Sequence, residues 1–380
     1  ARRGGTKPAP TPTAAGYYGS LQALKELPAK LGLGRYLVTD DRKRRKLDAA
    51  DSTRFDDGSP AKLDGTMGQC MWGWKADKPP RTQTVPFQPI KGKNSIYVPA
   101  GGISWIDAGV MDRTEQKLCS VISTDPRYRG GNGNALGDNY PLAADAPQKT
   151  MLGMPATALS TTAFGTNARK RGEGWEANWF VARAVVEYLF EIIMGTRNSQ
   201  AAFNAELDAN GLRQGGFGAG ATNMPNWDTY NGYYPVIPTS VGLEMGDGVG
   251  LVDYSVTNAD GVAVYQCKVP VFFGLVNAGF GNLWRWVRGL IMNAGDISEV
   301  YVAKSMYADF NPNSVDGMLK VAECPQREGY IIKKSYEGLC CMPTSVGGSA
   351  ATYYCDYFWT NAATSKGLRV RAAGGSVNSG

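Results

Sequence analysis

The sequence predicts an α+β fold with short antiparallel strands, one main buried helix and long loops, preceded by an extended basic N-terminal arm. The strongest helical pattern spans about residues 175–194, whereas the short apolar runs elsewhere are separated by turns. These runs do not alternate with helices, which argues against a parallel sheet built from βαβ units. The composition agrees, since 48 Gly, 9 Trp and 19 Tyr in 380 residues suit many tight turns and partly wet aromatic surfaces.

The first 60 residues are predicted to form the arm and a short helix, and residues 61–380 a single domain. Residues 1–16 are rich in Pro, Gly, Thr and Ala, a composition typical of extended segments. Residues 17–30 carry leucines at roughly helical spacing, and Gly32 and Gly34 end this pattern. Residues 1–50 hold eleven Lys and Arg against four Asp and Glu, and this balance of +7 leaves the rest of the +6 chain close to neutral.

The basic run from Arg42 to Lys46 has two interpretations. A solvated turn is the plainer one, and contact with nucleic acid or an acidic protein surface is the other. No aromatic residue interleaves with the run, so a dedicated site for single-stranded nucleic acid is not expected. We therefore expect no nucleic-acid partner.

Within the domain, strands and loops are expected in a definite order. Residues 68–74 are a predicted strand, and residues 95–106, after a Pro-rich loop, are a predicted pair of strands broken at Gly101-Gly102. Residues 124–148 form a long loop. Residues 248–256 and 262–275 are predicted strands, and residues 329–380 short strands and turns. The glycine-rich stretch within residues 212–220 follows a helical region instead of a strand, so it does not predict a phosphate-binding loop.

The helix at about residues 175–194 is predicted to be mostly buried, because its apolar side chains cover a wide arc. Gly195 stands where glycine commonly ends a helix. We interpret the aromatic residues of this helix as core. Trp284 and Trp286, in a glycine-bounded segment farther along, receive the same interpretation.

The composition argues against several classes of function. Histidine is absent, which removes the commonest general base and the commonest metal ligand. The seven cysteines form no Cys-x-x-Cys pair, so we expect buried reduced thiols in a protein assembled in the cytosol. No run of 18 apolar residues occurs, so membrane insertion is not expected. We expect no cofactor and no metal, since Glu244, Asp247 and Asp253 lack the spacing of a calcium-binding loop.

Residues 353–361 form a dense polar and aromatic segment. Its Tyr, Trp, Asp and Asn side chains are those that binding surfaces favour, because they offer contact area at low entropic cost. The alternative is a strand with half of its side chains buried. If the strand alternates, one face carries Tyr353, Cys355, Tyr357 and Trp359, and the other Tyr354, Asp356 and Phe358. Only one of these sets can face a ligand.

Five segments carry motifs that belong together when taken in order. They are Leu63–Gln69, Ala168–Trp175, Glu191–Gln200, Asn277–Gly289, and Tyr357–Asn361 followed by Gly374-Gly375-Ser376. This series resembles phage tail and virion proteins with a C-type-lectin-like fold of the formylglycine-generating-enzyme type. Many of those are the variable proteins of diversity-generating retroelements. The resemblance covers about residues 60–380.

The resemblance implies a scaffold whose last strands and loops display side chains toward a ligand. The ligand would be a host cell-surface protein or glycan, and the protein would be a homotrimer on a phage tail or capsid surface, assembled in the host cytoplasm. The N-terminal arm would attach it to other virion proteins. The implied ligand-binding residues are Tyr353, Tyr354, Asp356, Tyr357, Trp359, Asn361, Ser376, Asn378 and Ser379.

Two rival functions belong to the same resemblance. One is a structural virion component, such as a head fibre, decoration or tail-tip protein, without a receptor of its own. The other is a formylglycine-generating oxidase, whose reactive cysteine stands three residues after Gly-Gly-Ser. Ser379 occupies that position here, and a hydroxyl cannot replace a copper-bound thiol, so we expect no enzyme. The fold that the chain resembles continues through a further ligand-facing loop and a closing strand, so the domain is expected to be truncated near Gly380.

Overall fold

The fold was analysed in a computed structural model of the chain. The structure describes residues 21–73, 97–99, 110–112, 114–123, 125, 127–129, 131–132, 156–157, 159–173, 175–199, 201–203, 206, 239–257, 263–276, 284–304, 310–349 and 354–375. Most of its strands pair antiparallel and its helices are few, so the chain belongs to the α+β, β-rich class.

The N-terminal region holds α1 (Leu21–Leu31) and an antiparallel sheet in the order β2-β1-β3-β4. Its strands are β1 (Gly34–Val38), β2 (Arg44–Lys46), β3 (Gln69–Gly73) and β4 (Tyr97–Pro99). The helix and the strand at β3 confirm the sequence prediction, and β4 confirms part of the segment 95–106. The structure does not support the boundary expected at residue 60, because β1 pairs with β3 across it, from Gly34 opposite Gly73 to Val38 opposite Gln69. Residues 34–60 therefore fold together with the domain.

The basic run contributes to this sheet and is only partly a turn. Arg42 has a left-handed backbone with φ of 69°, and the exposed Lys43 carbonyl accepts the Thr39 N–H at 2.9 Å. Lys46 then lies in β2 and approaches Asp247 at 2.5 Å. Asp247 also accepts the Nε–H of the fully buried Arg35 at 3.4 Å. These contacts hold the N-terminal sheet against the start of β10.

The described residues in the middle of the chain form short strands and the helices α2 and α3. The strands are β5 (Val110–Asp112), β6 (Lys117–Cys119), β7 (Tyr128–Arg129), β8 (Gly131–Asn132) and β9 (Ala156–Thr157), of which β8 and β9 pair in parallel. The helices are α2 (Thr161–Arg169) and α3 (Phe180–Met194).

The main helix α3 begins five residues later than the sequence predicts. Trp179 caps it with extended backbone angles, φ −84° and ψ 142°, and bridges to Arg288, while Trp175 donates its indole N–H to the Asp40 carbonyl at 3.0 Å. The end is as predicted, since Gly195 takes the left-handed conformation with φ of 67° that favours glycine.

The C-terminal half is made of antiparallel strands in three further sheets. One contains β10 (Val249–Thr257), β11 (Ala263–Phe272) and β12 (Leu275–Val276), preceded by the 3₁₀ helix η4 (Thr239–Met245). The next has the order β15-β14-β13-β19, formed by β13 (Arg285–Ala294), β14 (Ser298–Val302), β15 (Leu319–Cys324) and β19 (Gly367–Ala373). The last has the order β17-β16-β18, formed by β16 (Gly329–Ser335), β17 (Met342–Val346) and β18 (Tyr357–Phe358), with η6 (Glu337–Leu339) between β16 and β17.

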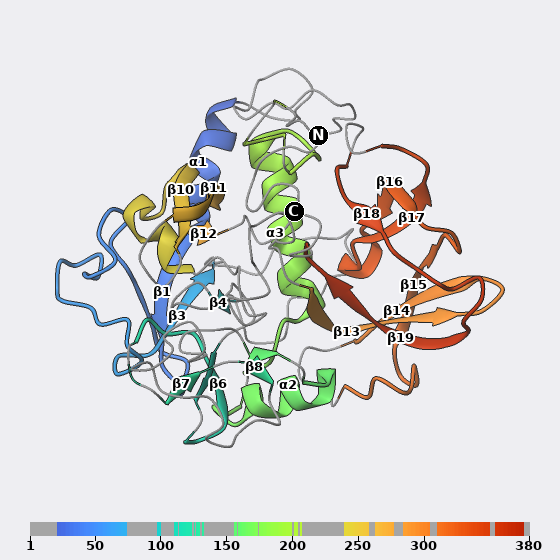
Figure 1. The fold of residues 1–380 in the computed structure, drawn as a ribbon, viewed down its shortest axis with the longest axis horizontal. Helices are drawn as coiled ribbons and strands as arrows, with labels where there is room; N and C mark the ends of the chain where they lie inside the picture. Colours follow the sequence, from blue (N-terminus) through green and yellow to red (C-terminus); the bar gives the residue numbers. More distant parts are fainter. Residues whose placement is uncertain are drawn as a thin grey trace.

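Helix α3 lies between the two sets of sheets, as Figure 1 shows. Val186, Phe190 and Ile193 pack against β11 and β12 together with Trp72 of β3. Phe180 and Ala184 belong to a second core cluster with the residues of β13 and β14. The prediction of a mostly buried helix is therefore confirmed, and burial of a side chain such as Phe190 contributes about 1.5–3 kcal/mol.

None of the seven cysteines forms a disulfide, and six of them are buried, as the sequence predicts. Burial raises the pKa of Cys70 to about 12, which keeps this thiol protonated and unreactive at neutral pH. In the part of the chain that the structure describes, no helix is long and apolar enough to cross a membrane.

Candidate ligand-binding surface

The structure divides the predicted ligand-binding residues into three groups. Trp359 is 64% exposed, Tyr357 is 38% exposed, and Asn361 is exposed as well. Asp356 is half-buried, and Tyr354 is only 3% exposed. Tyr353, Ser376, Asn378 and Ser379 lie outside the described residues. Tyr354 is therefore a core residue, and its assignment to the ligand-binding surface was wrong.

The segment alternates only in part. Tyr357 and Trp359 point to solvent, whereas Tyr354 points inward and Phe358 is half-buried against the core of the C-terminal sheets. Cys355, predicted to share the face of Tyr357 and Trp359, is half-buried and lies 3.2 Å from the Ser199 hydroxyl.

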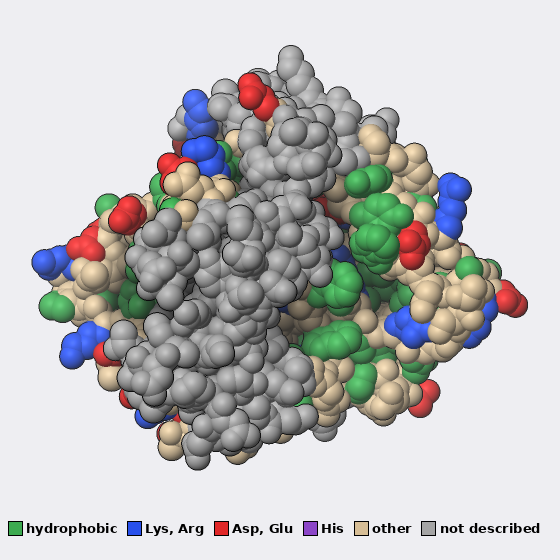
Figure 2. Space-filling view, in the orientation of Figure 1, with side chains coloured by type: hydrophobic (Ala, Val, Ile, Leu, Met, Phe, Trp, Pro, Cys, Tyr) green, Lys and Arg blue, Asp and Glu red, His purple; other side chains and the backbone are tan. Residues whose placement is uncertain are grey.

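Tyr330, Tyr357 and Trp359 form a contiguous set of rings, which we call the aromatic row. Tyr330 lies directly opposite Tyr357 in the pairing of β16 with β18. Their ring centroids are 5.0 Å apart at an interplanar angle of 85°, and Tyr357 and Trp359 follow at 4.5 Å and 45°. Figure 2 shows hydrophobic side chains gathered at the surface over β16 and β18. Sequence reasoning missed Tyr330, because only the pairing of β16 with β18 brings it to the row.

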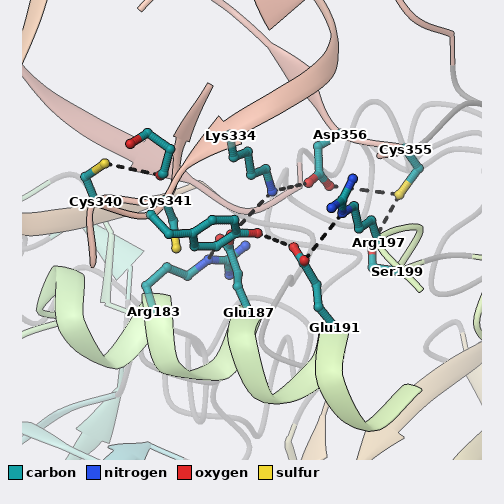
Figure 3. Close-up of polar contacts among 12 residues, drawn as sticks. Arg183, Glu187, Glu191, Arg197, Ser199, Lys334, Cys340, Cys341, Cys355 and Asp356 are labelled. Atoms are coloured by element: carbon teal, nitrogen blue, oxygen red, sulfur yellow. Dashed lines mark hydrogen bonds and ion pairs between the residues drawn. The ribbon is translucent and has the colours of Figure 1, made fainter. Parts of the chain in front are cut away.

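A largely buried cluster of charged side chains lies between α3 and the C-terminal strands (Figure 3). Arg183, Glu187 and Glu191 are spaced by four residues and so share one face of α3. Glu187, with 3% of its side chain exposed, lies 2.8 Å from Arg183, 3.3 Å from Lys334 and 3.6 Å from Arg371. Burial alone would raise the pKa of Glu187, but these three cations outweigh it and lower the pKa to about 2.

Lys334 connects this cluster to the segment that carries the row. Its ammonium group lies 2.8 Å from the Asp356 carboxylate and 3.3 Å from that of Glu187, and its side chain is only 4% exposed. Burial opposes the charge on Lys334, yet the carboxylates of Asp356 and Glu187 raise its pKa above the ordinary value. The same ammonium group lies 4.5 Å from the ring centroid of Tyr354. Lys334 thus contacts both Tyr354 and Asp356, and these two contacts hold the segment that leads to Tyr357.

The backbone completes this attachment. The Asp356 carbonyl accepts the Ile331 N–H at 3.0 Å, and β16 and β18 pair at Gly329–Phe358 and Tyr330–Tyr357. Glu191 closes the other end of the cluster, where it accepts the Tyr336 hydroxyl and lies 3.7 Å from Arg197. Burial raises the pKa of Glu191, which is less well compensated than Glu187. Arg183, Glu187 and Lys334 are buried, Glu191, Arg197 and Asp356 are half-buried, and the charges are paired with one another, so their arrangement suits holding the surface in place.

Trp284 and Trp286 are exposed, at 64% and 39%, so their assignment to the core was wrong. Trp286 is nevertheless fixed, because its indole N–H donates to the Leu159 carbonyl at 3.2 Å and its own carbonyl accepts the Asn178 amide at 2.8 Å. Arg285 pairs with Ala373 at the end of β19. The two tryptophans therefore lie beside the strand that leads to Gly374 and Gly375.

Comparison with known proteins finds no match, so a proposal of function depends on the fold and on this surface. No family model matches the chain, and no curated protein or solved structure matches it either.

Proposed function

We propose that this chain is a non-enzymatic recognition protein of a phage virion, which binds a host surface protein or glycan through its C-terminal region. The observation that carries the proposal is the aromatic row, in which the exposed rings of Tyr357 and Trp359 stand on an anchored segment and continue from the half-buried Tyr330 of β16. Large, rigid aromatic side chains provide contact area with little loss of conformational entropy, and exposed ones mark recognition sites. We assign ligand contact to Tyr330, Tyr357, Trp359 and Asn361.

The finer features of the proposal come from the sequence resemblance. They are a C-type-lectin-like scaffold, assembly as a homotrimer, and placement on the tail or capsid surface through the N-terminal arm. The residues Tyr353, Ser376, Asn378 and Ser379 would extend the ligand-binding surface beyond the row. The absence of histidine from the chain supports a role without turnover.

The test is binding of the purified, fluorescently labelled full chain to cells of candidate host strains. Trp359→Ala is expected to weaken binding at least about tenfold, because exposed aromatic anchors dominate the affinity of recognition surfaces. Ile297→Ala is the matched control, since Ile297 is an apolar side chain that is 57% exposed outside the row. Circular dichroism checks that both variants fold.

Two outcomes would contradict the proposal. Equal binding by wild type and a Tyr357→Ala/Trp359→Ala double variant would exclude the row as the contact surface. A wild-type chain that binds no cells but is required for particle assembly would instead indicate a structural virion component.

A further inference from the structure

The arrangement of the three rings limits what the aromatic row can bind. The centroids lie 5.0 and 4.5 Å apart, so neighbouring rings are in van der Waals contact and leave no space for a group between them. The row is thus not a cage that encloses a cation from several sides. Its exposed rings, Tyr357 and Trp359, form a narrow platform for a ligand that lies across them.

The charges around the row are of both signs. The Asp356 carboxylate, next to Tyr357 in the chain, is paired with the buried Lys334 at 2.8 Å. Arg327 and Glu328, just before β16, and Lys333, within it, are exposed charges that alternate in sign along the chain, and Arg327 also donates to the Val346 carbonyl at 3.2 Å. Asn361, two residues after Trp359, adds an exposed neutral amide. These residues therefore form no patch of a single sign that would select an ionic ligand.

The exposed rings of the row offer a small contact by themselves. Trp359 is 64% exposed and Tyr357 is 38% exposed. With about 150–250 Å² for each aromatic side chain, the two rings offer roughly 150–250 Å² of surface. This area suits a few sugar units, whereas a protein partner, which needs about 800 Å² on each side, would have to contact many residues besides the rings.

From these three observations we infer that the row binds an uncharged carbohydrate chain; the inference rests on the function proposed above. The C–H groups on one face of a sugar ring carry partial positive charge, and they pack against the negative face of an aromatic ring. The sugar hydroxyl groups, both donors and acceptors, match the amide of Asn361, which offers both kinds of partner. A chain of neutral sugars lying along Tyr357 and Trp359 satisfies the shape, the charge and the area together.

The experiment uses cells that bind the full-length chain and treats them in two ways. Periodate cleaves the vicinal diols of sugars, and protease removes surface proteins. We expect periodate to abolish binding and protease to leave it unchanged. Binding that survives periodate and is lost after protease would overturn the carbohydrate inference while leaving recognition of the host intact. A chain that binds no untreated cells would defeat the proposed function itself.

A competition assay then separates neutral from charged sugars. Surface polysaccharide extracted from the bound cells is divided by anion exchange into neutral and acidic fractions, and each is added as a competitor. The neutral fraction is expected to compete equally at 50 and 500 mM salt, since no ionic contact is screened. Competition by the acidic fraction alone, or by neither fraction, would overturn the inference. Trp359→Phe, which keeps a ring face, should stay within about threefold of wild type, whereas Trp359→Ala should lose at least about tenfold.

Discussion

Replacing Glu187 by Gln tests whether the buried charge cluster stabilises the fold and anchors the aromatic row. The change keeps the shape of the side chain but removes the charge that faces Arg183, Lys334 and Arg371. Burial is offset by these cations, and the pKa of Glu187 falls from 4.5 to about 2. By linkage, this fall corresponds to about 3 kcal/mol of stability at neutral pH. Removing one partner of a buried ion pair typically costs about 3–5 kcal/mol, which agrees.

The contribution of Glu187 to stability depends on pH in a definite direction. Because the pKa is lower in the folded state, the contribution of Glu187 is complete above about pH 4.5 and is lost as the pH falls toward about 2. Urea unfolding followed by tryptophan fluorescence should therefore show a loss of about 3 kcal/mol for Glu187→Gln at pH 7 that shrinks steadily in acid.

The matched control is Glu323→Gln, since Glu323 makes an ion pair with Lys320 at 2.9 Å but has 52% of its side chain exposed. Exposed pairs of this kind contribute less than about 1 kcal/mol. If Glu187→Gln cost no more than Glu323→Gln, or if its cost did not change with pH, the role given to the cluster would be refuted.

Two further variants test other parts of the structure. Burial raises the pKa of Glu191, so the folded wild type loses stability as the pH rises above the ordinary pKa of a glutamate. The stability of Glu191→Gln relative to wild type, measured by urea titration, should therefore increase from acid to neutral pH. A decrease over that range would contradict this. Gly289 has φ of 78°, and an added Cβ would lie 2.6 Å from the Trp179 ring, so Gly289→Ala should cost more than about 2 kcal/mol. Gly317→Ala, with φ of 72° and open space around it, isolates the backbone strain, and equal losses at both positions would show that the contact with Trp179 does not matter.

Local patterns were sufficient to predict the secondary structure of several segments. The apolar arc of α3 and its end at Gly195 depend only on neighbouring residues, and the structure confirms both. The start of α3 was misplaced because Trp179 is held outside the helix by Arg288, more than a hundred residues away. A bridge of that kind leaves no mark on the sequence near Trp179.

The burial of tryptophan and arginine was harder to predict, because here the usual preference is reversed. Trp284 and Trp286 are exposed, whereas Arg288 is fully buried between Glu176, at 2.9 Å, and the Thr161 carbonyl, at 2.5 Å. Arginine is rarely buried without partners, and these partners come from distant segments. Hydropathy therefore assigned the tryptophans to the core.

The ligand surface could be predicted only in part, because contacts between distant segments also decide which of its side chains are exposed. Tyr357 and Trp359 were identified from composition, and the alternation of the segment left open which face pointed outward. Tyr354 turned inward because Lys334 lies over its ring, a contact that depends on the pairing of β16 with its neighbours. Long-range pairing of strands also supplied Tyr330, which no local pattern singles out.

The attachment of the N-terminal sheet has a consequence for how the protein folds as it is synthesised. Arg35 contacts Asp247 across 212 residues, and the Trp72 indole N–H donates to the Phe273 carbonyl at 2.9 Å across 201 residues. The ribosome must therefore release most of the chain before the strands β1 and β3 gain these partners. Such distant contacts make folding slow and leave apolar strands exposed in the nascent chain. The buried strands of the N-terminal sheet therefore wait for their C-terminal partners through most of synthesis.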